Sequence, residues 1–334
     1  MMSWARSNDP TGRAFLVPRE TIWSLGWTSE RSPNYIPSQR TGWSRGGQAG
    51  LLFREQPEQK GRVARIIAIA NQKGGVGKTT TAINLGASLA VAERRTLVVD
   101  IDPQANATSG LGVQKENVEQ SVYDVLVEGT PANAAIVEKV HFPFLDVLPA
   151  TRDLVGVEVE LVNRKNRETI LKEALAPLRD RYDFILIDAP PSLGMLTLNT
   201  LAAADAVLIP IQCEFYALEG LSQLLNTVRI VQRNLNPSLQ IEGVLLTMFD
   251  SRLNLSRQVA DEAKEYFGPK VYRTAIPRNV RIAEAPSFGE PIVMYDIVSA
   301  GAKSYLALAK EVISRQQQGG ALGTDRMLAV GGGN

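Results

Sequence analysis

The amino-acid sequence predicts an α/β fold in which a mostly parallel, twisted β-sheet carries helices on both faces. Three observations lead to this prediction. Short apolar runs alternate along the chain with segments of helical periodicity, beginning with 65–71 and 78–91. Strands that alternate with helices are joined by crossover connections, which make the strands parallel. The first run ends in a glycine-rich turn and the one at 184–188 ends in an acid, as strands do at the ligand-binding edge of such sheets.

The elements follow in a regular order from residue 63 onward. Buried strands are predicted at the apolar runs 65–71, 96–100, 144–148, 184–188, 206–211 and 241–247. Helices are predicted at 78–91, 121–127, 154–163, 167–179, 194–203, 216–233, 254–267 and 299–315. The glycine-rich residues 317–334 are predicted to be a flexible tail, so the folded domain spans 63–316.

Residues 1–62 differ in composition from the rest and are predicted to be a mostly disordered extension. They hold all four tryptophans and nine basic against five acidic residues, a net +4, whereas 63–334 carry a net −3. Two interpretations stay open. The segment is an arm that adds affinity for DNA or a membrane surface, or the start codon is assigned too early and the chain begins near Val63. We favour the second.

The composition excludes several classes of protein. Its 44% hydrophobic and 21% charged residues are ordinary for a globular chain, and no run approaches the length of a membrane-spanning helix. Cys213 is the single cysteine, which excludes a disulfide framework and a cysteine-ligated iron–sulfur cluster within one chain. His141 is the single histidine, which leaves little for histidine-based metal or triad chemistry.

The sequence N-Q-K-G-G-V-G-K-T-T at 71–80 lies between a predicted strand and helix and predicts a phosphate-binding loop. Its glycines let several backbone N–H groups point into one concavity, and the helix adds the positive end of its dipole. Lys78 is expected to reach the β- and γ-phosphates and the Thr79 hydroxyl to bind Mg²⁺. Gln72 replaces the first glycine of the generic pattern, and Lys73 is a second lysine. The predicted nucleotide-binding residues here are Lys73, Gly74, Gly75, Val76, Gly77, Lys78, Thr79 and Thr80.

Acidic residues follow two of the predicted strands. Asp100 and Asp102 lie at the end of the second strand, and Asp188 ends the fourth. Ligands of open α/β sheets bind outside these strand ends. We expect Asp188 to hold Mg²⁺, usually through water, and Asp102 to position or activate the attacking water.

These motifs resemble those of the ParA/Soj-type chromosome-partitioning ATPases, P-loop NTPases of the deviant Walker A group that also includes MinD. The resemblance spans about 63–316. Its matching stretches are K-G-G-V-G-K-T-T-T-A-I-N-L at 73–85, D-I-D-P-Q-A-N-A-T-S-G-L-G at 100–112, L-P-A-T-R-D-L at 148–154, I-D-A-P-P-S at 187–192, E-F-Y-A-L-E-G at 214–220, G-V-L-L-T-M at 243–248 and I-P-R-N-V-R-I-A-E-A-P-S-F-G at 276–289.

The resemblance implies an ATP-dependent homodimer in which Lys73 reaches the ATP of the partner subunit, with Lys73, Lys78 and Asp102 as the catalytic set. It makes Pro277 and Asn279 candidate adenine contacts. It further implies a cytoplasmic, nucleoid-associated protein that binds double-stranded DNA without sequence preference and is released by a ParB-like partner that stimulates hydrolysis. The implied DNA-binding residues are Arg252, Arg278 and Arg281. Without the family, an equally good interpretation is that these arginines are solvated surface charges or form ion pairs with Asp250 and Glu284.

Three competing functions are weighed against this one. A MinD-like ATPase acting at the membrane needs a basic amphipathic C-terminal helix, whereas 319–334 hold one arginine and many glycines, so no stable membrane association is expected. An electron carrier resembling the nitrogenase iron protein needs two cluster cysteines per subunit. A plasmid partition ATPase that also represses its operon needs an N-terminal DNA-reading domain, for which 1–62 are too short and irregular.

Overall fold

The computed structural model describes residues 4–8, 14–18, 63–214 and 219–328, and the chain divides into two units, 1–62 and 63–334. In the first unit, β1 (Trp4–Asn8) pairs antiparallel with β2 (Ala14–Pro18). No strand was predicted there, because residues 1–62 show no sustained helical or alternating period. The remaining residues of this unit lie outside the described part of the chain, so the predicted disorder stays a prediction for them.

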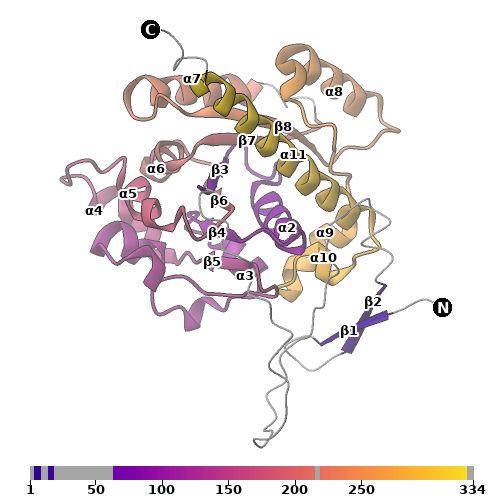
Figure 1. Ribbon diagram of the computed structural model, residues 1–334, viewed down its shortest axis with the longest axis horizontal. Helices are drawn as coiled ribbons and strands as arrows, with labels where there is room; N and C mark the ends of the chain where they lie inside the picture. Colours follow the sequence, from indigo (N-terminus) through magenta and orange to yellow (C-terminus); the bar gives the residue numbers. More distant parts are fainter. Residues whose placement is uncertain (1–3, 9–13, 19–62, 215–218, 329–334) are drawn as a thin grey trace, which may run out of the picture. The chain divides into compact units, whose positions relative to one another are not determined.

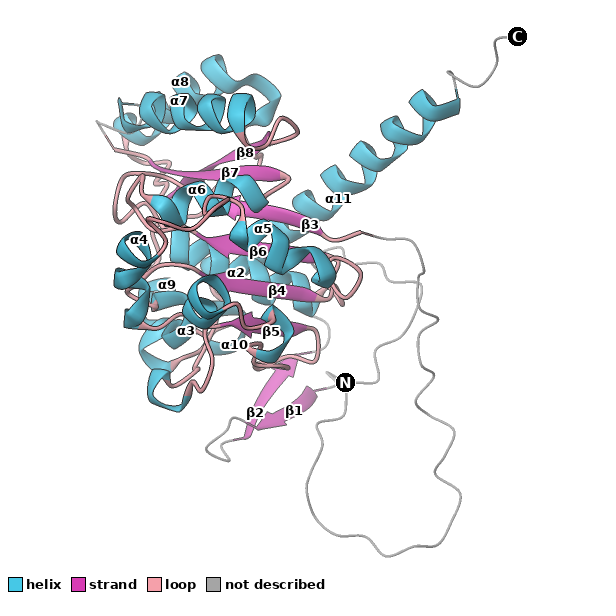
Figure 2. Cartoon of the chain, turned by 90° about the vertical axis from the view of Figure 1, so that its left-hand side faces the viewer, coloured by secondary structure: helices cyan, strands magenta, loops and turns pink. Residues whose placement is uncertain are grey.

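The second unit is built on a six-stranded sheet in which every neighbouring pair is parallel. Across the sheet the order is β5-β4-β6-β3-β7-β8, which Figure 2 shows as a stack from bottom to top. The predicted α/β class with a parallel sheet is therefore confirmed. The strands are β3 (Arg65–Ile69), β4 (Thr96–Asp100), β5 (Leu145–Leu148), β6 (Phe184–Asp188), β7 (Ala206–Gln212) and β8 (Gln240–Thr247).

Helices cover both faces of this sheet (Figure 1). One face carries α2 (Lys78–Val91) and α11 (Ala300–Leu328), and the other carries α5 (Ile170–Leu175) and α6 (Met195–Ala203). The helices α7 (Glu219–Asn234) and α8 (Asn254–Phe267) lie at the β8 end (Figure 2). Shorter helices are α3 (Asn106–Gly110), α4 (Val157–Glu160), α9 (Val280–Glu284) and α10 (Ile292–Tyr295). Single turns of 3₁₀ or π geometry occupy Lys115–Asn117, Asp124–Glu128, Ala132–Ala134, Arg152–Gly156, Ala176–Leu178, Gly268–Lys270 and Ala285–Phe288.

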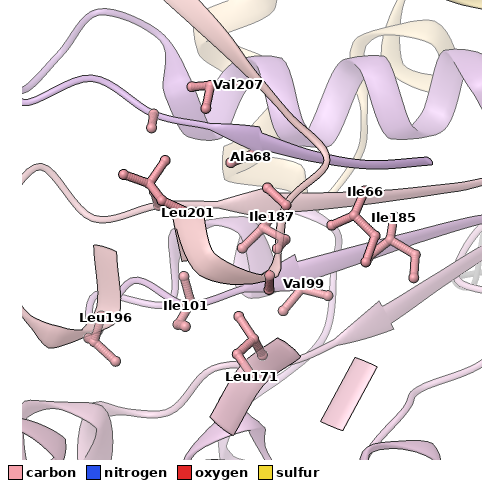
Figure 3. Packing of buried hydrophobic residues seen from close by; sticks show 14 of the residues in the cluster. Ile66, Ala68, Val99, Ile101, Leu171, Ile185, Ile187, Leu196, Leu201 and Val207 are labelled. Atoms are coloured by element: carbon pink, nitrogen blue, oxygen red, sulfur yellow. The ribbon is translucent and has the colours of Figure 1, made fainter. Parts of the chain in front are cut away.

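The core between the sheet and the α5–α6 layer is made of alternate strand residues. Figure 3 shows side chains from β3, β6 and β7 meeting Leu171 of α5 and Leu196 and Leu201 of α6. The alternate residues of the same strands point to the opposite face of the sheet, toward α2. There Gly86 of α2 packs close to Val98 of β4 and Leu186 of β6. Because both faces are covered, the central strands are buried at nearly every position, which explains why their sequences do not alternate in hydropathy.

Several helices differ from the prediction at their ends, and two predicted helices are largely replaced by other turns. The segment 121–127 runs into the π turn Asp124–Glu128, and 154–163 contains only the end of a 3₁₀ turn and the four residues of α4. The segment predicted as one helix over 167–179 is shorter, since α5 ends at Leu175 and a 3₁₀ turn containing Pro177 follows. The last helix is longer than the predicted 299–315 and continues to Leu328. Glycine costs a helix only about 1 kcal/mol relative to alanine, and no proline interrupts this stretch. Residues 329–334 lie outside the described part. No helix among the described residues is both long and apolar enough to cross a bilayer.

Candidate functional site

The predicted phosphate loop connects the end of β3 at Ile69 to the start of α2 at Lys78. Gly75 and Gly77 adopt left-handed backbone conformations with φ of 76° and 87°, which residues with a side chain rarely adopt. A Cβ atom added to Gly74 or Gly75 would meet no atom within 4 Å. The loop therefore presents its backbone to open space in front of the first turn of α2, as a phosphate group requires.

The neighbouring strands hold this loop in place. The Thr247 hydroxyl at the end of β8 donates to the carbonyl oxygen of Val76 over 2.8 Å. The Asn71 amide donates to the carbonyl oxygen of Pro210 in β7 over 2.7 Å, and the Asn71 Oδ1 accepts from the Lys73 N–H over 3.0 Å. Two strands that come more than 130 residues later in the chain thus fix the shape of the loop.

The Lys78 ammonium points back into the loop. Its Nζ donates to the carbonyl oxygen of Lys73 over 3.3 Å, and the residue is only 7% exposed. Burial lowers the pKa of Lys78, whereas the nearby carboxylates of Asp188 and Asp102 raise it. The structure therefore brings a buried cation together with two acids at the carboxyl edge of the sheet.

Asp100 and Asp188 are paired neighbours at the ends of β4 and β6. Asp100 accepts hydrogen bonds from the Thr108 N–H and hydroxyl over 2.8 and 2.7 Å and from the Asp102 N–H over 3.2 Å. Burial raises the pKa of Asp100 to about 6, although the bonds from Thr108 oppose the shift. Asp100 thus fixes the loop that carries Asp102, whose own Oδ1 accepts from the Gln104 N–H over 2.9 Å.

Both carboxylate oxygens of Asp188 are fully buried and accept no well-formed hydrogen bond from any described residue. Burial and the nearby Asp100 raise the pKa of Asp188 well above its usual range, while the nearby Thr79 hydroxyl and Lys78 oppose the shift. An unpaired buried carboxylate is costly, and a bound cation would compensate it. In the described part of the chain no cluster of three His, Cys, Asp or Glu residues could hold a metal ion. The unpaired carboxylate of Asp188 and the nearby Thr79 hydroxyl fit Mg²⁺ that takes its other ligands from phosphate oxygens and water, and their role in binding it stays a prediction.

Asp188→Asn should stabilise the nucleotide-free chain. Because the pKa of this carboxyl is raised on folding, its contribution to stability is complete below the unfolded pKa and is lost as pH rises through the folded pKa. The substitution removes that loss, so the free energy of unfolding at about pH 8 should rise by about 1 kcal/mol or more. Urea unfolding at about pH 5 and about pH 8 measures it, with a larger gain expected at the higher pH.

A control for this prediction is Asp261→Asn, which removes an exposed carboxylate paired with Lys264 and should change stability by less than about 0.5 kcal/mol. An Asp188→Asn chain that is less stable than the wild type at both pH values would contradict the interpretation of Asp188 as an uncompensated buried acid.

The segment that carries Pro277 and Asn279 lies beside the continuation of β8. Phe249 bridges to Pro277, and its N–H donates to the carbonyl oxygen of Ile276 over 2.9 Å. Asn279 is the N-cap of α9, where its Oδ1 accepts from the Ile282 N–H over 3.3 Å. Both candidate adenine contacts are half-buried on the chain segment next to Thr247, and their role in binding adenine stays a prediction.

All three arginines predicted to bind DNA are exposed and ion-paired. The Arg252 guanidinium binds Asp250 with two bonds of 2.9 and 2.7 Å. Arg278 reaches Glu214 over 3.5 Å. Arg281 contacts Glu284 over 2.9 Å and Asp296 over 3.6 Å. The alternative of pairing with Asp250 and Glu284 is therefore present in the structure, and DNA binding by these arginines stays a prediction.

Three residues that support the site were not predicted from the sequence. Asn71, Thr108 and Thr247 all lie where a strand or helix meets the carboxyl edge of the sheet. A polar side chain at the end of an apolar strand is the one available signal, and it applies to Thr247. It also applies to Asn71, which ends the apolar run 65–71, whereas Thr108 acts through contacts that no local pattern reveals.

Comparison with known proteins gives consistent results. A family model described as "AAA domain" matches residues 64–241. The chain is 61% identical over 250 residues to the sporulation initiation inhibitor protein Soj of Bacillus subtilis, covering 75% of this chain and 98% of that protein. It is 59% identical over 253 residues to the chromosome partitioning protein ParA of Myxococcus xanthus, covering 76% and 89%.

Solved structures agree with the fold. Cobyrinic acid a,c-diamide synthase from Mycobacterium smegmatis with bound ADP and magnesium is similar with a TM-score of 0.67 and 39% identity, over 77% of this chain and 96% of that one. The cell division ATPase MinD of Pyrococcus furiosus is similar with a TM-score of 0.63 and 30% identity, over 76% and 99%.

Proposed function

The chain belongs to the ParA/Soj family of chromosome-partitioning ATPases, and from this membership we propose that it segregates DNA by an ATP-driven cycle. It is an ATPase that uses ATP and Mg²⁺, as the family and the nucleotide-bound structural neighbours indicate. In the proposed cycle the ATP-bound homodimer binds double-stranded DNA without sequence preference. A ParB-like partner then stimulates hydrolysis and releases the dimer from the DNA of the nucleoid in the cytoplasm.

The observation that carries the proposal is the meeting of Lys78, Asp102 and Asp188 beside an open phosphate loop. The backbone N–H groups of 74–79 and the N-terminus of α2 hold the triphosphate, and Lys78 neutralises its β- and γ-oxygens. Thr79 and Asp188 would hold Mg²⁺, which would supply positive charge to the phosphate oxygens. Asp102 orients the attacking water and accepts its proton.

A second subunit completes this site in the proposal. Lys73 is half-buried, and its ammonium forms no ion pair with any residue in the described ranges. Its carbonyl oxygen accepts from the Lys78 ammonium, which holds the backbone from which the Lys73 side chain leaves the loop. A lysine from the partner subunit adds a cation to each triphosphate and excludes water, which strengthens the stabilisation of the transferring phosphoryl group.

ATP turnover measured with and without DNA and the ParB-like protein tests the proposed function. The expected result is slow turnover alone and faster turnover when both are present. Turnover that neither addition changes would contradict a partitioning cycle.

Replacing both Arg252 and Arg281 with alanine should weaken DNA binding and leave ATP binding intact. Both guanidiniums are exposed on segments that follow the same edge of the sheet, so the double substitution removes phosphate contacts without touching the phosphate loop. The slope of log affinity against log salt should become shallower by about 1 for each phosphate that is no longer neutralised. Fluorescence anisotropy with duplexes of unrelated sequence measures both quantities.

The matched control is Arg181→Ala, since Arg181 is also an exposed arginine in an ion pair, with Glu138, but lies at the amino end of β6. It should bind DNA like the wild type. Unchanged affinity in the Arg252→Ala, Arg281→Ala chain would show that DNA is bound elsewhere.

A further inference from the structure

The surface formed by Arg252, Arg278 and Arg281 carries at least as many carboxylates as guanidiniums. We propose that Asp250 and Glu284 compete with DNA phosphates for these arginines and set the threshold of DNA binding. On this basis a single subunit has too low an affinity to stay bound to DNA. The ATP-bound dimer presents the same surface twice, and its affinity is high enough. The inference rests on the proposed DNA-binding function and adds a regulatory role for two acidic residues.

Asp250 occupies Arg252 in the way a phosphate would. Two parallel hydrogen bonds join the guanidinium to both carboxylate oxygens, the geometry in which arginine also binds phosphate. The carboxylate is only 19% exposed, whereas the arginine side chain is 86% exposed. The Arg252 N–H also donates to Asp250 over 3.0 Å. The acid is thus fixed in the protein, and the cation above it faces solvent.

Glu284 does the same for Arg281. It accepts from the guanidinium over 2.9 Å and from the Tyr295 hydroxyl over 3.3 Å, which fixes the carboxylate from a second side. Asp296 adds a second acid at 3.6 Å from the same guanidinium.

The bonds from Arg252 hold the pKa of Asp250 at about 2, so this acid stays ionised at physiological pH.

The two pairs belong to one surface. The Arg278 N–H donates to the carbonyl oxygen of Phe249 over 3.3 Å, which joins the segment before Arg252 to the segment before Arg281. Three guanidiniums here meet four carboxylates, namely Asp250, Glu214, Glu284 and Asp296. With one more carboxylate than guanidinium among these groups, they exert no net attraction on a polyanion, and a phosphate must compete with a carboxylate to bind.

The test uses the full chain with Asp250→Asn, Glu284→Gln and both together. Asparagine keeps the acceptor for the Arg252 N–H, and glutamine keeps one for the Tyr295 hydroxyl, so both variants retain local structure while losing the charge. Affinity for duplex DNA of random sequence is measured across a salt series with no nucleotide, with ADP and with ATP. The control Glu138→Gln makes the same change in net charge at the Arg181 ion pair.

We expect each substitution to tighten DNA binding by about 5-fold and both together by at least about 10-fold. An exposed ion pair contributes only a small free energy, but the dimer contains each pair twice, so its loss affects the affinity of the dimer twice. The double variant should also bind DNA without nucleotide at salt concentrations where the wild type does not. Affinities equal to those of the wild type, or an equal gain in Glu138→Gln, would overturn the inference. Failure of the proposed function is distinct, because the ATP-bound wild type would then bind no DNA at all.

Discussion

Lys78→Ala is expected to abolish ATP binding at concentrations that saturate the wild-type chain. The Lys78 ammonium is buried against the carbonyl oxygen of Lys73, and the nearby carboxylates of Asp188 and Asp102 raise its pKa. Without it, a triphosphate in the loop faces two acids with no buried lysine or arginine among the residues that the structure describes. Removing a buried, hydrogen-bonded charge costs about 2–5 kcal/mol, so the dissociation constant should rise by about 30-fold or more.

Isothermal titration calorimetry with ATP and Mg²⁺ measures this loss directly. The matched control is Lys270→Ala, because the Lys270 ammonium also donates to a backbone carbonyl oxygen, that of Ile241, but near the amino end of β8. The control should bind ATP as the wild type does. A Lys78→Ala chain with wild-type affinity would mean that the loop backbone alone holds the triphosphate.

Asp102→Ala should keep ATP binding and trap the ATP-bound dimer. Asp102 lies just beyond β4, 7% exposed, and close enough to Lys78 to raise the pKa of that lysine. The substitution removes negative charge from the surroundings of the phosphates, so binding is retained, whereas the base that orients water is lost. General-base catalysis contributes about 10²–10⁴-fold, and turnover should fall by at least about 100-fold.

Gel filtration with ATP and a phosphate-release assay give the two readouts. Asp102→Asn is the informative companion, because its amide oxygen still accepts from the Gln104 N–H but takes no proton. Equal loss of turnover in both variants assigns the effect to the carboxylate and not to a collapsed turn. An Asp102→Ala chain that binds ATP and stays strictly monomeric would contradict the proposed role.

The six strands of the parallel sheet were predictable because each is a short apolar run with a clear boundary. The predicted ends of 96–100 and 184–188 coincide with β4 and β6, and the acids that close these runs predicted where Asp100 and Asp188 would meet. The phosphate loop was predictable for a similar reason, since its glycines and lysines are contiguous. The family of the chain followed from the order and spacing of its motifs.

The interactions that stabilise the site were not predictable from local pattern. Thr247 meets Val76 across 171 positions of sequence, and Asn71 meets Pro210 across 139. Likewise the ion pairs of Arg252 and Arg281 with near neighbours were foreseen as an alternative, but that of Arg278 with Glu214 was not. Helices of four or five residues, such as α3 and α9, complete too few turns to show a period.

The place of β3 in the sheet determines when the site is assembled during synthesis. The loop at 71–77 is among the first parts of the domain to leave the ribosome, yet its strand pairs only with β6 and β7, which begin at Phe184 and Ala206. More than a hundred residues must be synthesised after β3 before either of these partner strands exists, and non-local pairing of this kind is slow. Thr247, whose hydroxyl donates to the carbonyl oxygen of Val76 in the loop, is synthesised later still. The loop can therefore take the shape that binds ATP only after most of the domain has been synthesised. ATP is not expected to stabilise a shorter nascent chain.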